Sequence, residues 1–309
     1  MKNDTIGLEG MEVSELIREL RMEKKILQNV LYEGLCKRKV YFQLENGEVI
    51  MDELLSERLF SRLHVQYRLV DIMLNDNSFW QKECRYEINL QIRKRRWERA
   101  EKLLREYEIK APQTRLHIQY VMVKRAEILA ATGQKNAGAL FREALELTMS
   151  VPELEKRMNG SAVIAEDELW MYFGYRLWDK PFSVEEYIAF LGRVEEWFLS
   201  VQIYTEVYFE AAYQCAHMLW KAEQYVFCRE LCQKAISWLR RGGKRFHLPE
   251  FYFVDVMAGM KSKHDPVEEK ELFQQCKVAY YVSLSFGENE TAKRIKEQCE
   301  EEFGWHITD

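Results

Sequence analysis

Apolar positions recur along most of the chain at the spacing of an α-helix. In segment 13–25 they stand at Val13, Leu16, Ile17 and Leu20, the i, i+3, i+4, i+7 pattern that places side chains on one helix face. Similar periodicity continues from about residue 77 to the end, and no segment shows the alternation that predicts a strand. The five prolines fall between the periodic segments, where helices must stop. The pattern predicts an all-α fold.

Between residues 13 and 65 the periodic segments are short. They cover residues 13–25, 27–36, 37–45 and 51–63. The second contains a turn at Gly34, and the third, with Val40, Tyr41 and Leu44 as its expected core positions, ends at Asn46-Gly47. Helices of this length do not persist alone in water. We therefore expect them to pack together into a small N-terminal bundle.

The later segments recur at a length typical of tetratricopeptide repeats. Pro181 and Pro249 stand 68 residues apart, which is twice 34. A pattern of small and aromatic residues recurs in one frame, and a weaker copy lies at 279–299. The matches are Trp97/Ala100/Leu104, Ala137/Phe141/Ala144 and Tyr225/Cys228/Cys232/Ala235. In the last match Ala216 stands twelve residues before Cys228. These matches predict a right-handed α-solenoid of helix hairpins. Segment 153–200 fits the frame poorly, and there Ser183 and Glu186 form a capping-box pattern that opens a helix.

Charge is distributed unevenly, although the net charge is only −5. Seven cations and three anions lie between Arg18 and Lys39, whereas five anions and no cation lie between Glu45 and Glu57. The counts predict a basic surface beside an acidic one. Lys37, Arg38 and Lys39 crowd a helix start, where the helix dipole disfavours each exposed cation by about 0.3 to 1 kcal/mol. A bound anion would offset this cost; a solvated charged face is the simpler alternative.

A helix, a glycine turn and a second helix that begins with cations are typical of a helix-turn-helix DNA reader. Residues 14–63 resemble the phage-repressor or XRE class through "LIRELRMEKK", "EGLC", "QLENG" and the glutamine that opens the second helix. The resemblance implies that Gln28 and Asn46 lie at DNA phosphates and that Arg38, Lys39 and Gln43 face base edges. Lys37 joins this DNA-binding set through its charge.

Two residues depart from the XRE pattern. Phe42 stands where a small or polar residue is usual, and Glu48 follows Gly47 where a cation is common. Phe42 either contacts a thymine methyl group or marks a DNA reader that has become a protein contact. The second possibility is an adaptor, in which the bundle docks a protein partner through Phe42 and the acidic stretch from Glu45 to Glu57.

The whole chain from Val13 onward is similar to the peptide-sensing transcription regulators of Gram-positive bacteria that include the Rgg, PlcR and Rap types. The likeness runs through "RRWERAEKLLREYE", "LFREALELT" and "AEQYVFCRELCQKAISWLRRGGK". It implies a homodimer on a double-stranded DNA operator, with an oligopeptide or protein ligand on the concave face of the repeats. The implied division is a flexible segment 1–12, a helix-turn-helix domain 13–70, and a repeat domain 71–309 for sensing and dimerisation.

The repeat frame supplies candidates for the peptide-binding face. Counting from the small residue of each first helix, these are Arg85, Asn89, Gln119, Met122, Glu210, Tyr213, His217 and Trp220. Asn and Arg side chains there would hydrogen-bond a peptide backbone. Aromatic residues at helical spacing are also common in protein cores, so the same positions suit a purely structural role.

Other kinds of chemistry find little support. No secretory signal pattern precedes the seven cysteines, so we expect reduced thiols in the cytoplasm. No apolar run is long enough for a membrane span. Cys228 and Cys232, with Cys215 and His217 before them, have the composition of a zinc site, but the repeat frame explains them as core. The remaining histidines are isolated and no phosphate-binding loop occurs. We expect no cofactor, no metal and no enzymatic activity.

Overall fold

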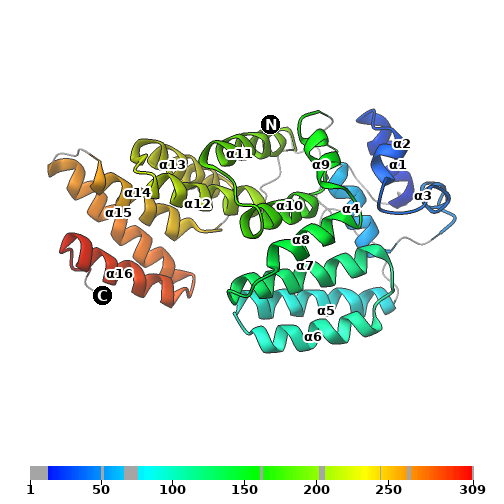
Figure 1. The fold of residues 1–309 in the computed structure, drawn as a ribbon, viewed down its shortest axis with the longest axis horizontal. Coiled ribbons are helices and arrows are strands. Elements are labelled where there is room, and N and C mark those ends of the chain that lie inside the picture. Colours follow the sequence, from blue (N-terminus) through cyan, green and yellow to red (C-terminus); the bar gives the residue numbers. More distant parts are fainter. Residues whose placement is uncertain are drawn as a thin grey trace. The chain divides into compact units, whose positions relative to one another are not determined.

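The computed structural model describes residues 13–49, 52–65, 76–160, 163–201, 206–243, 245–262 and 266–307. Within these ranges helix is the only regular secondary structure (Figure 1), so the all-α prediction is confirmed. The chain forms two compact units, Met1–Pro181 and Phe182–Asp309. The expected flexible segment 1–12 and the expected boundary at residues 70 and 71 lie outside the described residues.

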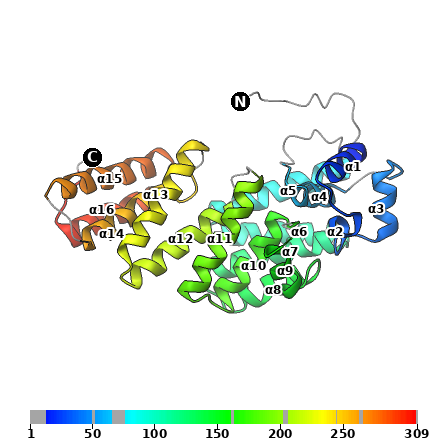
Figure 2. The same cartoon turned by 90° about the horizontal axis from the view of Figure 1, so that it is seen from above.

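Four short helices form a bundle at the start of the first unit (Figure 2). They are α1 (Val13–Glu23), α2 (Gln28–Tyr32), α3 (Arg38–Glu45) and α4 (Glu53–Arg62). Their core contains Leu31, Leu59 and Phe60, and it is completed by Leu116 from a later helix. Because Leu116 of the repeats packs into this core, contacts with the repeats help to stabilise the bundle.

The turns of this bundle lie where the sequence predicts them. Gly34 adopts a φ of 78° after α2, and Gly47 adopts a φ of 72° after α3. The predicted core of α3 is only partly right, because Tyr41 and Leu44 are buried whereas Val40 is 36% exposed. Residues 41 and 44 share one helix face, and Val40, one position earlier, points about 100° away from Tyr41.

The rest of the first unit consists of helix hairpins. The helices are α5 (Asp76–Arg93), α6 (Trp97–Lys110), α7 (Arg115–Ala131), α8 (Ala137–Glu146), α9 (Val151–Met158) and α10 (Glu166–Trp178). From α5 to α8 each helix packs on the next, and α10 then packs on α8. Ala100 and Ala144 are fully buried, as the repeat pattern predicts. A Cβ atom on Gly174 would lie 2.6 Å from the Phe141 ring, so α10 approaches α8 closely only because that position is glycine.

The second unit continues with α11 (Val184–Val201), α12 (Glu206–Lys221), α13 (Tyr225–Arg241), α14 (Leu248–Lys261), α15 (Pro266–Ser285) and α16 (Asn289–Phe303). The predicted capping box opens α11: the Ser183 amide donates to Glu186 Oε2 at 2.9 Å and the Glu186 amide donates to Ser183 Oγ at 3.2 Å. The Cys228 thiol lies 3.2 Å from the carbonyl oxygen of Ala216, the small residue twelve positions before it in the repeat pattern.

Helices α12 to α16 form two layers. Each helix packs on its neighbour in sequence, and in addition α12 contacts α14 and α14 contacts α16. Successive helices of the α12/α14/α16 layer therefore lie closer together than α13 and α15 do, and the stack curves toward the closer layer. We call the surface of α12, α14 and α16 the inner face of the second unit.

Two cysteines of the second unit are arranged differently from the others. Cys276 of α15 and Cys299 of α16 form a disulfide, although all thiols were expected to be reduced. The repeat packing places these two buried residues opposite each other in one hairpin. The remaining cysteines are free thiols; Cys228 and Cys232 are buried in the core as the repeat frame predicts, and Cys215 is buried as well.

Candidate functional site

The start of α3 presents an exposed positive surface. Lys37 is the N-cap residue, and its side chain, like those of Arg38 and Lys39 in the first turn, is exposed. No acidic residue stands in that turn and no side chain caps the free amides of α3. Since the dipole and the side chains are both positive there, this surface favours an anionic partner.

Both departures from the XRE pattern contact predicted DNA-binding residues. The Arg38 guanidinium lies 5.3 Å from the centroid of the half-buried Phe42 ring, a cation–π distance. The Asn46 amide donates to Glu48 Oε1 at 3.2 Å. Phe42 therefore supports Arg38 rather than standing free as a docking side chain, and Glu48 orients Asn46. Gln43 is half-buried on the same helix.

Glu45 holds the bundle together beneath this surface. Its Oε1 accepts hydrogen bonds from Arg21 Nε at 2.7 Å and from the Tyr41 hydroxyl at 3.2 Å, and its Oε2 accepts one from the Gln28 amide. Burial, together with the Glu45 carboxylate, raises the pKa of Tyr41, so this hydroxyl remains a donor. Gln28 thus has one amide hydrogen directed at Glu45, and a side-chain amide has a second to offer.

The acidic surface expected between Glu45 and Glu57 does not form. Glu45 and Glu53 are buried, and Asp52 caps α4 by accepting a hydrogen bond from the Leu55 amide at 3.3 Å. Asp52 also bonds His117 at 3.1 Å, and Glu57 lies 3.7 Å from Arg85. A local charge count fails here because the partners of these acids belong to other helices: Arg21 to α1, Arg85 to α5 and His117 to α7.

Helix α4 joins the bundle to the repeats through a buried ion pair. Arg62 Nη2 donates to Glu168 Oε1 of α10 at 2.6 Å, and both side chains are 0% exposed. Burial alone would raise the pKa of Glu168, but the charges of Arg62 and Arg58, together with hydrogen bonds from Arg62 and the Ala165 amide, outweigh it and hold that pKa below its usual value. Arg62 Nη1 also donates to the carbonyl oxygens of Leu31 and Glu33, each at 2.8 Å. One guanidinium thus connects α2, α4 and α10.

A second set of contacts fixes the other side of α4. Arg85 of α5 donates to Glu53 Oε2 at 2.6 Å and lies 3.4 Å from the Tyr107 hydroxyl. That hydroxyl lies 2.7 Å from His117 Nδ1, and His117 in turn bonds Asp52. The histidine that looked isolated in the sequence is therefore part of a polar chain between α4 and α5 to α7.

Two residues predicted to line a peptide-binding groove are engaged inside the protein instead. Arg85 is buried in the contacts with α4, and Gln119 is buried and donates to the Ala144 carbonyl at 2.7 Å and to Thr148 Oγ1 at 2.8 Å. We correct the prediction for these two positions: Arg85 faces α4, and Gln119 faces α8, on which α7 packs, so neither side chain lines an open groove. Asn89 and Met122 are half-buried.

In the second unit the predicted residues Glu210, Tyr213 and His217 come together on the inner face. Glu210 Oε2 lies 2.6 Å from His247 Nε2, and the His247 ring stacks on Tyr213 with a centroid distance of 4.4 Å and an interplanar angle of 6°. His217 meets the edge of Tyr213 at 4.6 Å. Trp220, one turn farther along α12, packs against the apolar cluster around Phe253, Val256 and Ile295. His247 was missed because it precedes α14 and follows no helical period.

The pKa values within this cluster diverge. Burial would lower the pKa of His247, but its bond to Glu210 and the nearby carboxylates of Glu250 and Glu288 raise it. Burial would raise the pKa of Glu210, but the same bond lowers it. Burial, with the charges of Lys221 and Arg294, lowers the pKa of His217. The inner face therefore favours the charged form of one histidine, His247, and the neutral form of the next, His217.

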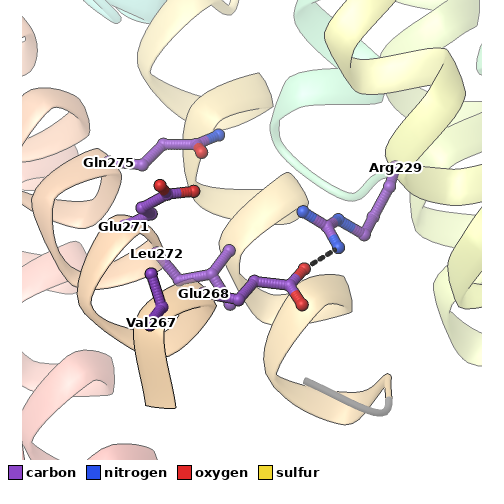
Figure 3. A pocket seen from close by; sticks show the side chains of 6 residues that line it. All are labelled: Arg229, Val267, Glu268, Glu271, Leu272 and Gln275. Atoms are coloured by element: carbon purple, nitrogen blue, oxygen red, sulfur yellow. Dashed lines mark hydrogen bonds and ion pairs between the residues drawn. The ribbon is translucent and has the colours of Figure 1, made fainter. Parts of the chain in front are cut away.

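A pocket of about 330 Å³ lies between α13 and α15 of the second unit. Figure 3 shows Arg229 reaching toward Glu268. Arg229 Nη1 donates to Glu268 Oε1 at 2.7 Å, and Arg229 Nε donates to the buried Asp255 at 3.2 Å. Asp255 also accepts a hydrogen bond from Gln275 at 2.6 Å. These charged groups are paired within the protein. They join α13, α14 and α15 and leave the pocket without a free charge from Arg229, Glu268 or Asp255.

Among the described residues no group of three or more His, Cys, Asp or Glu side chains is arranged to hold a metal ion. In the same part of the chain, none of the helices combines the length and the apolar character that crossing a membrane requires.

Solved structures resemble this chain to different degrees, and the first of them shares its fold. The structure of PlcR from Bacillus thuringiensis in complex with the peptide PapR7 and DNA aligns over 92% of this chain and 98% of its own, with a TM-score of 0.52 and 11% identity. ComR from S. thermophilus, in complex with DNA and its signalling peptide ComS, aligns over 93% and 98% with a TM-score of 0.43 and 14% identity. The pheromone receptor Rgg2 from Streptococcus dysgalactiae aligns over 94% and 100% with a TM-score of 0.39 and 13% identity. No family model and no curated protein matches the sequence.

Proposed function

We propose that this protein is a DNA-binding transcription regulator of the Rgg and PlcR kind, and that its helical repeats bind an oligopeptide or protein ligand. The observation that carries the proposal is the exposed cationic start of α3 within a helix-turn-helix bundle. The fold shared with PlcR, which was solved with peptide and DNA, supports it. Such a regulator acts in the cytoplasm and needs neither a cofactor nor catalytic activity.

In this proposal α3 enters the major groove. Arg38, Lys39 and Gln43 face base edges, with Phe42 holding the Arg38 guanidinium in place. Lys37, Gln28 and Asn46 contact phosphates on either side, Gln28 with the amide hydrogen that Glu45 does not use. The protein binds as a homodimer, since helix-turn-helix readers meet two half-sites about one turn of DNA apart.

The contacts of α4 supply a route from the repeats to the DNA-binding bundle. Arg62 and Glu168 are both fully buried, so a displacement of α4 against α10 that separates them leaves a buried charge without its partner. A ligand that favours one arrangement of the repeats would therefore favour one placement of α3. The ligand itself is proposed to occupy the inner face of the second unit, at Glu210, Tyr213, His217 and Trp220.

The first test is a gel shift with the purified protein and its own upstream DNA at two salt concentrations. Binding that weakens steeply with salt is expected, because each phosphate contact releases counterions. No binding at low salt would overturn the regulator and favour an adaptor. The acidic surface on which the adaptor depends is not formed, since Glu45 and Glu53 are buried.

Substitutions in α3 test the assignment of roles. Arg38→Ala should weaken operator binding by about 1 to 3 kcal/mol, whereas Lys37→Ala should mainly reduce the salt slope by about one unit. The triple variant Arg38→Ala/Lys39→Ala/Gln43→Ala should abolish sequence selectivity in a competition gel shift. Lys94→Ala/Lys102→Ala removes the same number of exposed charges from the loop after α5 and from α6, and is the matched control. Full selectivity in the triple variant would contradict the proposal.

A further inference from the structure

Helix α15 carries apolar side chains on two opposite sides. On the side that faces the protein, Leu272, Cys276 and Ala279 are buried in the core of the second unit. On the other side large apolar side chains are exposed: Val267 by 66%, Val278 by 42%, Tyr281 by 46% and Leu284 by 41%. The described residues of α16, by contrast, include no exposed large apolar side chain. A helix that is apolar all round is normally covered on both sides, so the outward side of α15 indicates an interface.

The outward side of α15 follows one line along the helix. Val267, Gln274 and Tyr281 are spaced seven residues apart, which is close to two turns and keeps them on one side. An open hollow of about 430 Å³ lies on this side, and it is lined by Gln274, Lys277, Val278, Tyr281, Val282 and Ser285. We call the surface of these residues, together with Val267 and Glu271, the outer face of α15.

The outer face of α15 is complementary to a second copy of itself. When two α15 helices lie antiparallel around a twofold axis at Gln274, residues at equal distances before and after Gln274 meet each other. Val267 and Tyr281, seven residues on either side, then form an apolar contact, and Glu271 and Lys277, three residues on either side, form an ion pair. The symmetry produces each of these contacts twice.

The two charges are available for such a contact. Glu271 is exposed and Lys277 is half-exposed, and neither has an ion-pair partner in the described part of the protein. The Lys277 ammonium lies 4.4 Å from the centroid of the Phe273 ring, a cation–π contact that places the side chain without neutralising its charge. A partner of different sequence would not require an acid and a base at equal distances from one residue. The pattern therefore favours a second copy of this chain.

We propose that two copies of this protein associate through the outer faces of their α15 helices, antiparallel and with Gln274 at the twofold axis. The inference rests on the proposed function, which requires a homodimer, and it names the surface that joins the protomers. Val267 of each copy enters the hollow of the other, beside Tyr281. The ion pairs between Glu271 and Lys277 fix the antiparallel register, since a shifted or parallel pairing loses them.

The first experiment measures the dimer dissociation constant of the full chain by sedimentation equilibrium over a range of protein concentrations. Tyr281→Glu should raise this constant by at least about tenfold, because the new carboxylate would be buried against an apolar side chain. Phe227→Glu is the matched control. It changes an aromatic side chain that is 61% exposed at the start of α13, outside the outer face of α15, and should leave the constant unchanged.

Charge reversal tests the register. Glu271→Lys and Lys277→Glu should each weaken the dimer, because like charges then face each other across the axis. The double variant Glu271→Lys/Lys277→Glu should recover most of the affinity. Residues six apart do not face each other on one helix, so a purely structural role within a single chain would not produce this recovery.

The outcomes separate this inference from the proposed function. A dimer whose dissociation constant is unaffected by Tyr281→Glu, or a double charge variant that stays as weak as the single variants, would overturn the inference and leave the homodimer in place. An unmodified protein that remains a monomer both free and on its DNA would overturn the homodimer as well. The gel shift still decides DNA binding independently.

Discussion

At the scale of single residues, charge in the N-terminal bundle serves two purposes that look alike in the sequence. Lys37, Arg38 and Lys39 remain exposed and unpaired by acids in their own turn. Glu45, seven residues after Arg38, is buried and receives three hydrogen bonds. The cationic residues are available to a partner, and the acid fixes the helix from which they project.

Replacing Glu45 tests this division. Glu45→Ala leaves the Arg21 guanidinium and the amide of Gln28 without their acceptor, and we expect a loss of about 3 kcal/mol in the free energy of unfolding of the bundle. Urea unfolding and amide hydrogen exchange of α3 measure it. Glu48→Ala, at an exposed position after the same helix, should change stability by less than about 0.5 kcal/mol. Equal effects of the two substitutions would refute the central role of Glu45.

At the scale of helices, the contacts that matter are ion pairs, fully or partly buried, between elements far apart in the chain. Arg62 of α4 and Glu168 of α10 are 106 residues apart, and Glu210 of α12 and His247 before α14 are 37 apart. Each pair fixes the register of two packed helices more narrowly than apolar contacts alone, because a displaced partner leaves a charge without compensation.

Removing only one partner of the ion pair between Arg62 and Glu168 should destabilise the protein strongly. Glu168→Ala leaves a fully buried guanidinium without its carboxylate, so the free energy of unfolding of the first unit should fall by about 3 to 5 kcal/mol. The double variant Arg62→Met/Glu168→Leu removes both charges and should recover most of that loss. Denaturant unfolding measures the free energy of unfolding of the two variants. A double variant that is no more stable than Glu168→Ala would show that the charges themselves are needed.

The pair of Glu210 and His247 makes the stability of the second unit depend on pH. The pKa of His247 is raised above its ordinary 6.5, so its stabilising contribution is complete below that value and is lost as pH rises through the raised pKa. The lowered pKa of Glu210 keeps its own contribution present throughout this range. Between pH 5.5 and 8.5 the unfolding temperature of the natural protein should fall more than that of Glu210→Gln. Parallel curves for both proteins would argue against a charged pair.

At the scale of the whole first unit, one contact between the N-terminal bundle and the repeats depends on a glycine. Gly34 combines a φ of 78° with an approach so close that an added Cβ would lie 1.7 Å from the Thr148 carbonyl oxygen. No side chain fits between the turn after α2 and the end of α8. The bundle is therefore docked on the repeats through its backbone as well as through Arg62.

Gly34→Ala should move the turn after α2 away from the end of α8. Left-handed strain and the clash together should destabilise the unit by roughly 2 to 4 kcal/mol, and limited proteolysis should detect a looser bundle. Gly133→Ala is the matched control, because Gly133 has a φ of 67° but nothing within 4 Å of an added Cβ, so only the strain of about 1 to 2 kcal/mol applies. If both variants behave alike, the contact with Thr148 contributes nothing.

The sequence by itself determined the helical class, the starts of α2 and α11, the turns at Gly34 and Gly47, and the small residues that let hairpins pack. These features depend on local periodicity, capping and backbone freedom, which neighbouring residues control. It also predicted that Glu210, Tyr213 and His217 share one side of α12, because helical spacing alone sets that.

Only the tertiary structure decided which charges are buried and which residues meet across the inner face. Glu53, Arg62 and Arg85 look like solvated residues until α4 packs on α5 and α10, since their partners come from other helices. The same holds for His247 and Glu288, which join the α12 residues through the stacking of helix on helix. Burial and pairing are properties of three-dimensional neighbours, and a local count of charge contains no information about them.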